Sequence, residues 1–362
     1  MKIARVDCIP LRIPFDDYGS APGLMPTKWT HLEMALVRVE TTDGVIGWGD
    51  AFAYSCLSAV TAAIRDMVAP LVVGREIDDI AAVNLELQRR LHLHGRYGIT
   101  IFAISGVDVA LWDAKAKAKG MSLAHLLGGR TRSSIPAYAS LVRYSEPALV
   151  AKLAKQAVAE GYRDVKLHEI TLEAIEAGRN AVGPGIRLTT DINCNWSAAD
   201  AERLMPHMKR LDLYWVEEPL FPPDDAGPLK ALEQKFGVPL ASGENACTSV
   251  EFARTVPAIT YTQPSVTKVG GVSEFMRVAE LAKAAGRTIM PHSPYFGPGY
   301  WATLQLAAAC PNAELFEYLY IKPEADVGLG LPHPVKGAVT IPDKPGIGFD
   351  PDMAVIERYR VK

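Results

Sequence analysis

The sequence predicts an α/β protein in which a (β/α) barrel follows a smaller α+β domain. The first observation is a regular alternation of strand-like and helix-like segments from about residue 134 onward. The second is a different pattern before it, with short alternating strands followed by long helices. The third is the length of 362 residues, which is more than one simple core usually serves. In such barrels the functional side chains gather at the carboxyl ends of the strands.

The first 50 residues are expected to form a small antiparallel sheet. Three segments carry strand patterns: Lys2–Ile13, His31–Glu40 and Val45–Trp48. A hairpin signal, Thr41-Thr42-Asp43-Gly44, joins the second segment to the third. Residues 15–26, rich in Gly, Pro and Ser, predict a mobile loop between the first two strands.

The next part of the chain is expected to be helical. Three segments show a 3.6-residue period: Val60–Met67, Ile80–Leu91 and Ile101–Lys119. Gly120 then follows as a helix stop, because glycine readily adopts the left-handed conformation found there.

The barrel region contains eight strand-like segments with helical segments between them. The strands are expected near residues 135–140, 163–168, 186–191, 212–217, 238–243, 259–264, 287–291 and 314–318. The Pro- and Gly-rich stretch 322–362 is expected to pack back on the first domain. We therefore predict a capping domain at 1–128, completed by 322–362, and a barrel at 134–321.

Composition excludes several classes of function. The formal net charge is −3 and no basic block exists to neutralise phosphates, so we expect no nucleic-acid partner. No apolar run is long enough to span a bilayer, and Met1-Lys2-Ile3 begins a strand-like segment rather than a signal peptide. The five cysteines are scattered, odd in number and without CxxC spacing. This usage predicts reduced thiols in a cytoplasmic protein.

Three acidic residues end three successive predicted barrel strands. They are Asp191, Glu217 and Glu244, at intervals of 26 and 27 residues. Each interval suits one strand–helix–strand unit, so the three carboxylates are expected at the same end of neighbouring parallel strands. Like charges this close repel one another, and carboxylate oxygens are the ligands that Mg²⁺ prefers. The spacing therefore predicts a Mg²⁺ site.

Together, these and other motifs resemble the enolase superfamily, in its mandelate racemase-like branch. The resemblance covers essentially the whole chain. It rests on Ala110-Leu111-Trp112-Asp113, Leu126-Leu127-Gly128-Gly129, Lys166-Leu167-His168, Asp191-x-Asn193, Glu217-Glu218-Pro219, Gly243-Glu244-Asn245, Lys268-Val269-Gly270-Gly271, Pro291-His292 and Glu317. It implies a modified (β/α)7β barrel under a capping domain, with Mg²⁺ on the three acids. It also implies removal of the proton next to a carboxylate, giving an enediolate held by the metal.

The resemblance assigns roles to side chains around the metal. Lys166 and His168 lie two apart and so point the same way from a strand. By the resemblance, Lys166 meets the substrate carboxylate and His168 is the base. His292 corresponds to the histidine of an Asp–His dyad, but Ser265 stands where the family has the aspartate. A serine supplies no charge, so we expect His292 to act as an acid rather than a strong base.

Several further residues are expected in or beside this site. Glu317 could hydrogen-bond the metal-bound carboxylate if it stays protonated. Asn193, Ser265 and Lys268 are expected to contact the ligands and bases. Substrate contacts are expected from the loop at 15–30, from Tyr54, Arg143 and Asn195. A Met25–Trp29 stretch in that loop could exclude water from the site.

The leading hypothesis is a Mg²⁺-dependent lyase that dehydrates a polyhydroxy (sugar) acid to a 2-keto-3-deoxy acid. The second hypothesis is a racemase or epimerase of an α-hydroxy or α-amino carboxylate, which needs a base on each face. A cycloisomerase is weaker still, because Lys268 lies three residues too late for the catalytic lysine of that branch. From another class, a non-catalytic carboxylate binder is also considered. We expect a small-molecule carboxylate as substrate, no membrane partner, and a homo-oligomer by resemblance.

Overall fold

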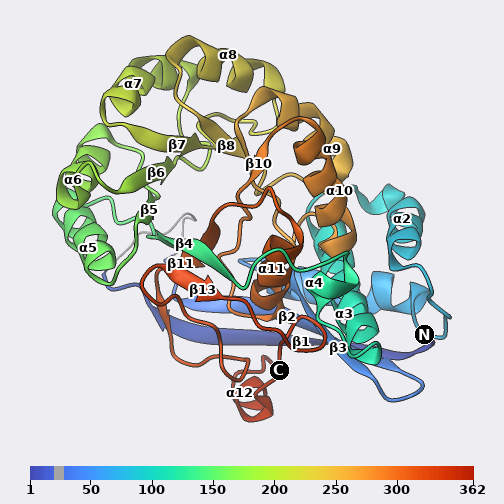
Figure 1. Cartoon of the computed structure of the whole chain (residues 1–362). Helices are drawn as coiled ribbons and strands as arrows, with labels where there is room; N and C mark the ends of the chain where they lie inside the picture. Colours follow the sequence, from blue (N-terminus) through green and yellow to red (C-terminus); the bar gives the residue numbers. More distant parts are fainter. Residues whose placement is uncertain (20–27) are drawn as a thin grey trace.

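The computed structural model describes residues 1–19 and 28–362. Part of the expected loop at 15–30 therefore lies outside the described residues, and Met25 belongs to that part. Figure 1 shows the two parts of the molecule, a ring of helices around the barrel strands and a sheet with its own helices below and beside it.

The antiparallel sheet predicted for the first residues is confirmed. Its three main strands pair in chain order and are β1 (Ile3–Asp16), β2 (His31–Thr41) and β3 (Ile46–Phe52). Ile9, Leu11 and Ile13 alternate along β1 and are all buried, as expected for a strand with one face on a core. The hairpin turn forms at the predicted place, since Gly44 N donates to Thr41 O at 3.0 Å.

Helical segments follow this sheet, and α1 (Leu57–Ala63) and α3 (Ile99–Ala118) pack against it. The other segments are the short helical turns η1 (Ile64–Val68), η2 (Ala69–Leu71) and η3 (His92–His94), and helices α2 (Ile80–Arg90) and α4 (Leu123–Leu126). Helix α3 lies directly on β3. A Cβ at Gly47 would be 2.1 Å from the Ala110 carbonyl oxygen, so this close packing requires glycine.

All eight predicted barrel strands are present and parallel. They are β4 (Ser134–Ser140), β5 (Asp164–Leu167), β6 (Arg187–Asp191), β7 (Leu213–Glu217), β8 (Leu240–Ser242), β9 (Tyr261–Thr262), β10 (Thr288–Ile289) and β11 (Phe316–Leu319). The order is β10-β9-β8-β7-β6-β5-β4-β11, and a parallel bridge links Ile289 of β10 to Ala313, three residues before β11 begins. The fold is thus a TIM-type barrel with an α+β domain.

The barrel helices are α5 (Pro147–Ala159), α6 (Leu172–Val182), α7 (Ala198–Arg210), α8 (Ala226–Phe236), α9 (Thr248–Thr255), the turn η4 (Val256–Ala258), α10 (Gly271–Ala284) and α11 (Pro298–Ala309). Most of the barrel helices form the outer ring in Figure 1, and α11 is drawn inside it, beside α4. Their apolar faces pack on the strands; Val150, Leu153 and Ala154 of α5 are all buried in this way.

The last segment of the chain contacts both parts. Strand β12 (Lys322–Pro323) pairs with β1, and β13 (Ala338–Thr340) pairs antiparallel with β4. After α12 (Met353–Arg358), Val361 N donates to Pro10 O at 2.9 Å. The division into domains at residues 128, 134 and 322 stays a prediction.

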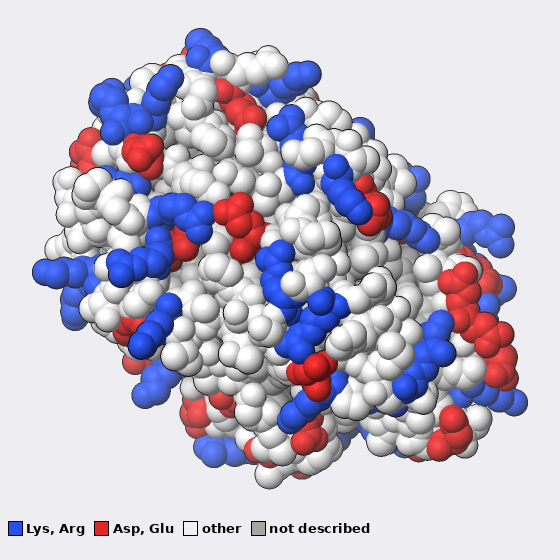
Figure 2. All heavy atoms as spheres, in the orientation of Figure 1, with Lys and Arg blue, Asp and Glu red and all other residues white. Residues whose placement is uncertain are grey.

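Side chains of both charges are interspersed over the face drawn in Figure 2. Within residues 1–19 and 28–362, no helix combines the length and apolar character that a membrane crossing needs. The five cysteines, all among the described residues, are free thiols.

Candidate active site

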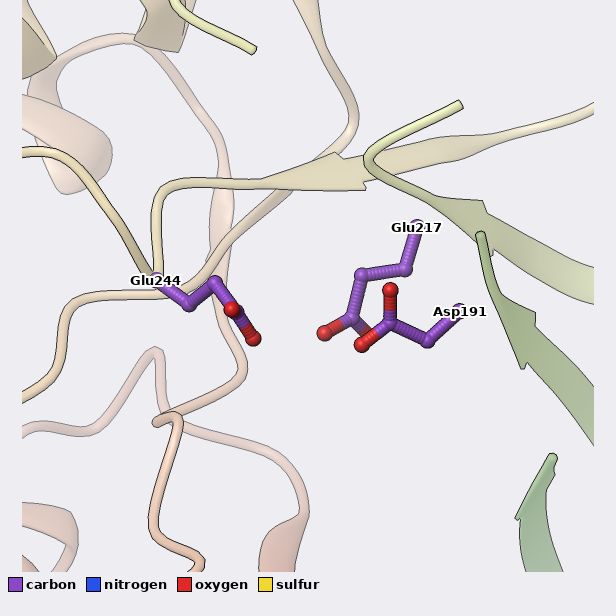
Figure 3. Close-up of side chains that lie close together, drawn as sticks. All are labelled: Asp191, Glu217 and Glu244. Carbon is purple, nitrogen blue, oxygen red and sulfur yellow. The ribbon is translucent and has the colours of Figure 1, made fainter. Parts of the chain in front are cut away.

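Asp191, Glu217 and Glu244 converge at the carboxyl ends of β6, β7 and β8. One carboxylate oxygen from each lies within 4.8 Å of those of the other two. Figure 3 shows Asp191 and Glu217 extending from neighbouring strands toward Glu244, which follows β8. The register explains this, because Asp191 lies directly beside Glu217 in the sheet. The predicted juxtaposition of the three acids is therefore present in the structure.

Lys166 of β5 lies among these acids and is fully buried. Its Nζ is 2.8 Å from Glu217 Oε1, 3.0 Å from Glu317 Oε1 and 3.3 Å from Asp191 Oδ2. Burial alone would lower the pKa of Lys166, but Glu217 and Glu317 raise it well above its ordinary value. Lys166 is therefore a fixed positive charge at the centre of the site.

One ammonium does not balance the negative charge gathered here. Burial, with repulsion between the carboxylates, raises the pKa of Asp191 to about 7 and that of Glu217 to about 8 in spite of Lys166. Three buried carboxylates with shifted pKa values and converging oxygens are a suitable ligand set for a hard divalent cation. The residues present thus fit Mg²⁺.

His168 follows β5 and faces the same cluster. Its Nδ1 makes a short hydrogen bond with the Leu141 carbonyl oxygen, and its Nε2 is 3.5 Å from Asp191 Oδ2. A carbonyl only accepts, so Nδ1 carries the proton of the neutral ring and Nε2 presents a lone pair. Burial, and then the Lys166 charge, lower the pKa of His168 to about 3. The ring is neutral at physiological pH.

Arg143 donates hydrogen bonds to two residues beside the carboxylate cluster. Its Nε donates to the His168 carbonyl at 2.6 Å, and its Nη2 donates to Asn193 Oδ1 at 3.0 Å. Asn193 N in turn donates to Asp191 Oδ1 at 2.8 Å. Arg143 also lines the cavity between the barrel and the first sheet. The side chain therefore links the base candidate to a metal-ligand candidate as well as facing the substrate space.

His292 lies on the other side of the metal-ligand cluster, after β10. Its Nε2 is 3.0 Å from Glu244 Oε2, and its Nδ1 is 3.2 Å from Ser265 Oγ. The hydroxyl of Tyr295 is 3.3 Å from the same Nδ1 and makes a short hydrogen bond with Ser265 Oγ. The sequence patterns do not single out Tyr295. The only available signal was a tyrosine three residues after His292, which does not say where its hydroxyl points.

Glu317 of β11 completes the ring of acids. It accepts from Ser140 Oγ at 2.8 Å and from Ser293 N at 2.9 Å, besides Lys166. Burial opposes ionisation, but Lys166 and His292 lower the pKa of Glu317 to about 2. Glu317 is therefore ionised in this arrangement, and it lacks the proton that a hydrogen bond to a substrate carboxylate would need.

A cavity of about 130 Å³ lies between these groups and the first sheet. Its capping side is mainly apolar, formed by Trp29, Leu32, Met34, Phe52 and Tyr54 among others. Trp29 packs edge-to-face against Phe15 and at a tilt against Tyr54, with ring centroids 4.9 Å and 4.7 Å apart. The Tyr54 hydroxyl is buried and has no hydrogen-bond partner among the described residues, so it is available to a substrate oxygen.

Of the remaining predicted residues, Lys268 lines the cavity and Asn195 does not. Lys268 lines the cavity, with its Nζ 4.4 Å from the centre of the Phe52 ring and 3.0 Å from Asn245 Oδ1. Asn195 does not appear in the lining. Its side-chain amide instead donates to Ile192 O and Asn193 O, at 2.8 and 2.9 Å, within its own turn.

Comparisons with known proteins identify the family of this chain. A family model described as "Enolase C-terminal domain-like" matches residues 149–355, and one described as "Mandelate racemase / muconate lactonizing enzyme, N-terminal domain" matches residues 24–128. Arabinonate dehydratase of Saccharolobus solfataricus is 29% identical over 344 residues, which are 91% of each chain. D-galactarolactone cycloisomerase of Agrobacterium fabrum is 30% identical and covers 100% of this chain and 99% of its own.

Solved structures extend the likeness to the whole fold. A racemase from Streptomyces coelicolor with bound magnesium superposes with a TM-score of 0.86 at 27% identity, covering 99% of this chain and 100% of its own. The family models together match more than half of the chain, including β2, β3 and the helices that follow them, and the part of the barrel that holds the three carboxylates. The chain therefore belongs to the enolase superfamily, in the mandelate racemase-like branch.

Proposed function

We propose that this protein is a Mg²⁺-dependent lyase that dehydrates a sugar acid to a 2-keto-3-deoxy acid. The observation that carries the proposal is the opposed placement of two histidines around one cluster of carboxylates. His168 offers a lone pair on Nε2, whereas His292 has hydroxyls at one ring nitrogen and Glu244 at the other. The related sugar-acid dehydratases support the reaction class.

Each group around the cavity has a distinct role in this reaction. Asp191, Glu217 and Glu244 would hold Mg²⁺, which would stabilise the negative charge that develops on the substrate carboxylate. Lys166 adds a second positive charge beside that carboxylate. His168 Nε2 takes the α-proton, so the α C–H bond breaks and a C=C bond forms toward the β-carbon. His292, in its protonated form, gives its Nε2 proton to the departing β-hydroxyl, which leaves as water. The resulting enol tautomerises to the keto acid.

A second candidate is the cycloisomerisation of a cyclic sugar acid. Two observations favour it over racemisation and over simple carboxylate binding. The D-galactarolactone cycloisomerase is similar over the full chain, and the capping side of the cavity presents aromatic and aliphatic side chains rather than many hydroxyl partners. Aromatic faces such as Trp29 and Tyr54 suit the C–H face of a ring better than an extended polyol.

A panel of aldonic acids, aldaric acids and their lactones, incubated with enzyme and Mg²⁺ in D₂O, distinguishes these reactions. A 2-keto-3-deoxy product supports the lyase, and an isomer of unchanged composition formed from a lactone supports the cycloisomerase. Deuterium at the α-carbon with inversion would instead indicate a racemase. Tight binding with neither product nor exchange would indicate a carboxylate binder.

Two variants test the assigned roles on whichever acid reacts. His168→Ala should abolish α-proton exchange, because the lone pair that takes the proton is removed. His292→Ala should leave exchange and stop elimination. Unchanged exchange in His168→Ala would show that another residue is the base, and loss of both activities in His292→Ala would make His292 that base.

A further inference from the structure

A second cavity, of about 480 Å³, lies among the loops that follow β6, β7 and β8, with Tyr97 of the first part of the chain as a further wall. Among the described residues, it has no lining residue in common with the active-site cavity. Its volume falls in the range of about 300–1,000 Å³ that is usual for small-molecule sites. The proposed reaction gives this cavity no role.

Three carboxylic acids line the second cavity, and no lysine or arginine is among its described lining residues. The acids are Glu218, Asp224 and Glu251. Glu218 is 1% exposed and accepts hydrogen bonds from neutral groups. Asp224 is half-buried, and its carboxylate has no hydrogen-bond partner within residues 1–19 and 28–362. Lys268 and Arg254 act on Glu218 and Glu251 from outside the lining. The cavity itself is therefore acidic and lacks a cation of its own.

The spacing of these acids suits an organic cation better than a metal ion. In the part of the chain that the structure describes, only Asp191, Glu217 and Glu244 bring three ligand atoms within 4.8 Å of one another. The three acids of the second cavity therefore do not converge on one point, as the oxygen ligands of a hard metal ion must. A guanidinium group presents five N–H donors in several directions of one plane, so it can use acceptors that lie apart.

The second cavity also contains a polar group without a partner and exposed aromatic surface. Thr255 is 1% exposed, and its Oγ1 has no hydrogen-bond partner among the described residues. A buried hydroxyl in this state destabilises the protein until a ligand or a water molecule bonds it. Phe221 and Tyr97 also line the cavity and are 79% and 52% exposed. Aromatic faces of this kind attract planar cations.

We infer that the second cavity is a binding site for a small guanidinium compound with an apolar chain. Asp224 and Glu251 accept hydrogen bonds from the guanidinium group, and Thr255 Oγ1 supplies a further acceptor. The apolar chain lies against Phe221. This site is separate from the proposed reaction and does not depend on it.

Butylguanidinium and butylurea are a matched pair of probes, because they have nearly the same shape and differ in charge. Isothermal titration calorimetry uses the full chain saturated with Mg²⁺, so that the active-site acids already have their cation. Butylguanidinium should bind with a Kd of about 1 mM or tighter, and butylurea should not bind detectably. Absence of butylguanidinium binding, or equal binding of the two probes, would overturn the inference. An affinity that falls as protein concentration rises would show that a second copy covers the cavity, and would also overturn it.

Two variants test whether the probe occupies this cavity. Asp224→Asn should weaken butylguanidinium binding about tenfold, because a charge-assisted hydrogen bond is lost. Thr255→Val keeps the shape of the side chain, removes its hydroxyl and should weaken binding about threefold. Asp225→Asn is the matched control, since it removes the same charge one residue away and asparagine also caps helix α8. It should bind as the wild type does. Wild-type affinity in Asp224→Asn, or an equal loss in Asp225→Asn, would overturn the inference.

Discussion

At the scale of single residues, the site is governed by the competition between burial and charge. Lys166 is the one ammonium within hydrogen-bond distance of Asp191, Glu217 and Glu317 among the described residues. Removing one charged side chain from a buried ionic cluster leaves the opposite charges buried without a counter-charge. This destabilises the folded protein strongly. Loss of the ammonium should therefore affect the metal-free protein most, and loss of a carboxylate should affect metal binding.

Lys166→Met should destabilise the metal-free protein by about 3–5 kcal/mol, because the carboxylates lose their buried counter-charge. Mg²⁺ should recover much of this loss, since a divalent cation supplies positive charge to the same oxygens. Urea unfolding with EDTA and with Mg²⁺ measures both quantities. Lys152→Met, at an exposed position of α5, is the control. Equal stability of the two variants in EDTA would contradict the electrostatic account.

Asp191→Asn should weaken Mg²⁺ binding at least about tenfold, because a neutral amide replaces a charged oxygen ligand. Isothermal titration calorimetry measures the affinity directly. Asp350→Asn, an exposed substitution of the same kind, should bind Mg²⁺ as the wild type does. Unaltered affinity in Asp191→Asn would remove this carboxylate from the ligand set.

At the scale of elements, the start of helix α10 is fixed against helix α3. Gly271 has φ +79°, and a Cβ there would be 2.4 Å from Asp108 Oδ1. Asp108 accepts from Ser273 N at 3.0 Å and from Ser273 Oγ at 2.6 Å. The first N–H groups of a helix have no partner within the helix, and the Asp108 carboxylate accepts hydrogen bonds at this N-terminus. The close approach of α3 to α10 therefore stabilises the start of α10.

Gly271→Ala should therefore cost more than the strain of a left-handed backbone alone. The matched control is Gly183→Ala, with φ +74° and open space around the new methyl group. We expect about 1–2 kcal/mol of destabilisation for the control and a further ~1–3 kcal/mol for Gly271→Ala from the clash. Chemical denaturation of both variants gives the difference. Equal losses of unfolding free energy in the two variants would mean that α3 and α10 can move apart to accept the methyl group without destabilising the protein.

At the scale of the whole molecule, two aspartates from the first part of the chain meet two barrel helices. Asp108 lies at the start of α10, and Asp50 of β3 accepts a short hydrogen bond from Gly299 N in the first turn of α11. Burial raises the pKa of each to about 7. Contact between the first part of the chain and the barrel helices thus removes both carboxylates from water.

The stability contributed by Asp108 should depend on pH with a definite sign. Its folded pKa is raised above the ordinary value, so between about pH 4 and 7 the folded state binds the proton more tightly than the unfolded state. Stability from this group should fall as pH rises through that window, with a slope approaching about 1.4 kcal/mol per pH unit. The difference in unfolding free energy between wild type and Asp108→Asn isolates it from the active-site acids. Asp350→Asn should show no such slope, and a flat difference for Asp108→Asn would contradict the prediction.

Local patterns in the sequence determined much of this protein. Period-2 and period-3.6 patterns predicted the first sheet, its helices and all eight barrel strands. The matched intervals between Asp191, Glu217 and Glu244 predicted their convergence, because parallel strands end at a common edge. The two-residue spacing of Lys166 and His168 likewise placed both on one face of a strand. These properties depend only on neighbours within one strand–helix unit.

Other properties were decided only by the tertiary structure. Which hydroxyl meets His292 Nδ1 depends on how the loop carrying Tyr295 passes over Ser265, 30 residues earlier in the chain. The cavity lining depends on how β2 and β3 lie across the barrel mouth, and the buried roles of Asp50 and Asp108 depend on the same contact. Hydrogen-bond partners and desolvation are set by distances between segments far apart in the chain. A sequence pattern fixes where a side chain points from its own strand or helix, but not what it meets there.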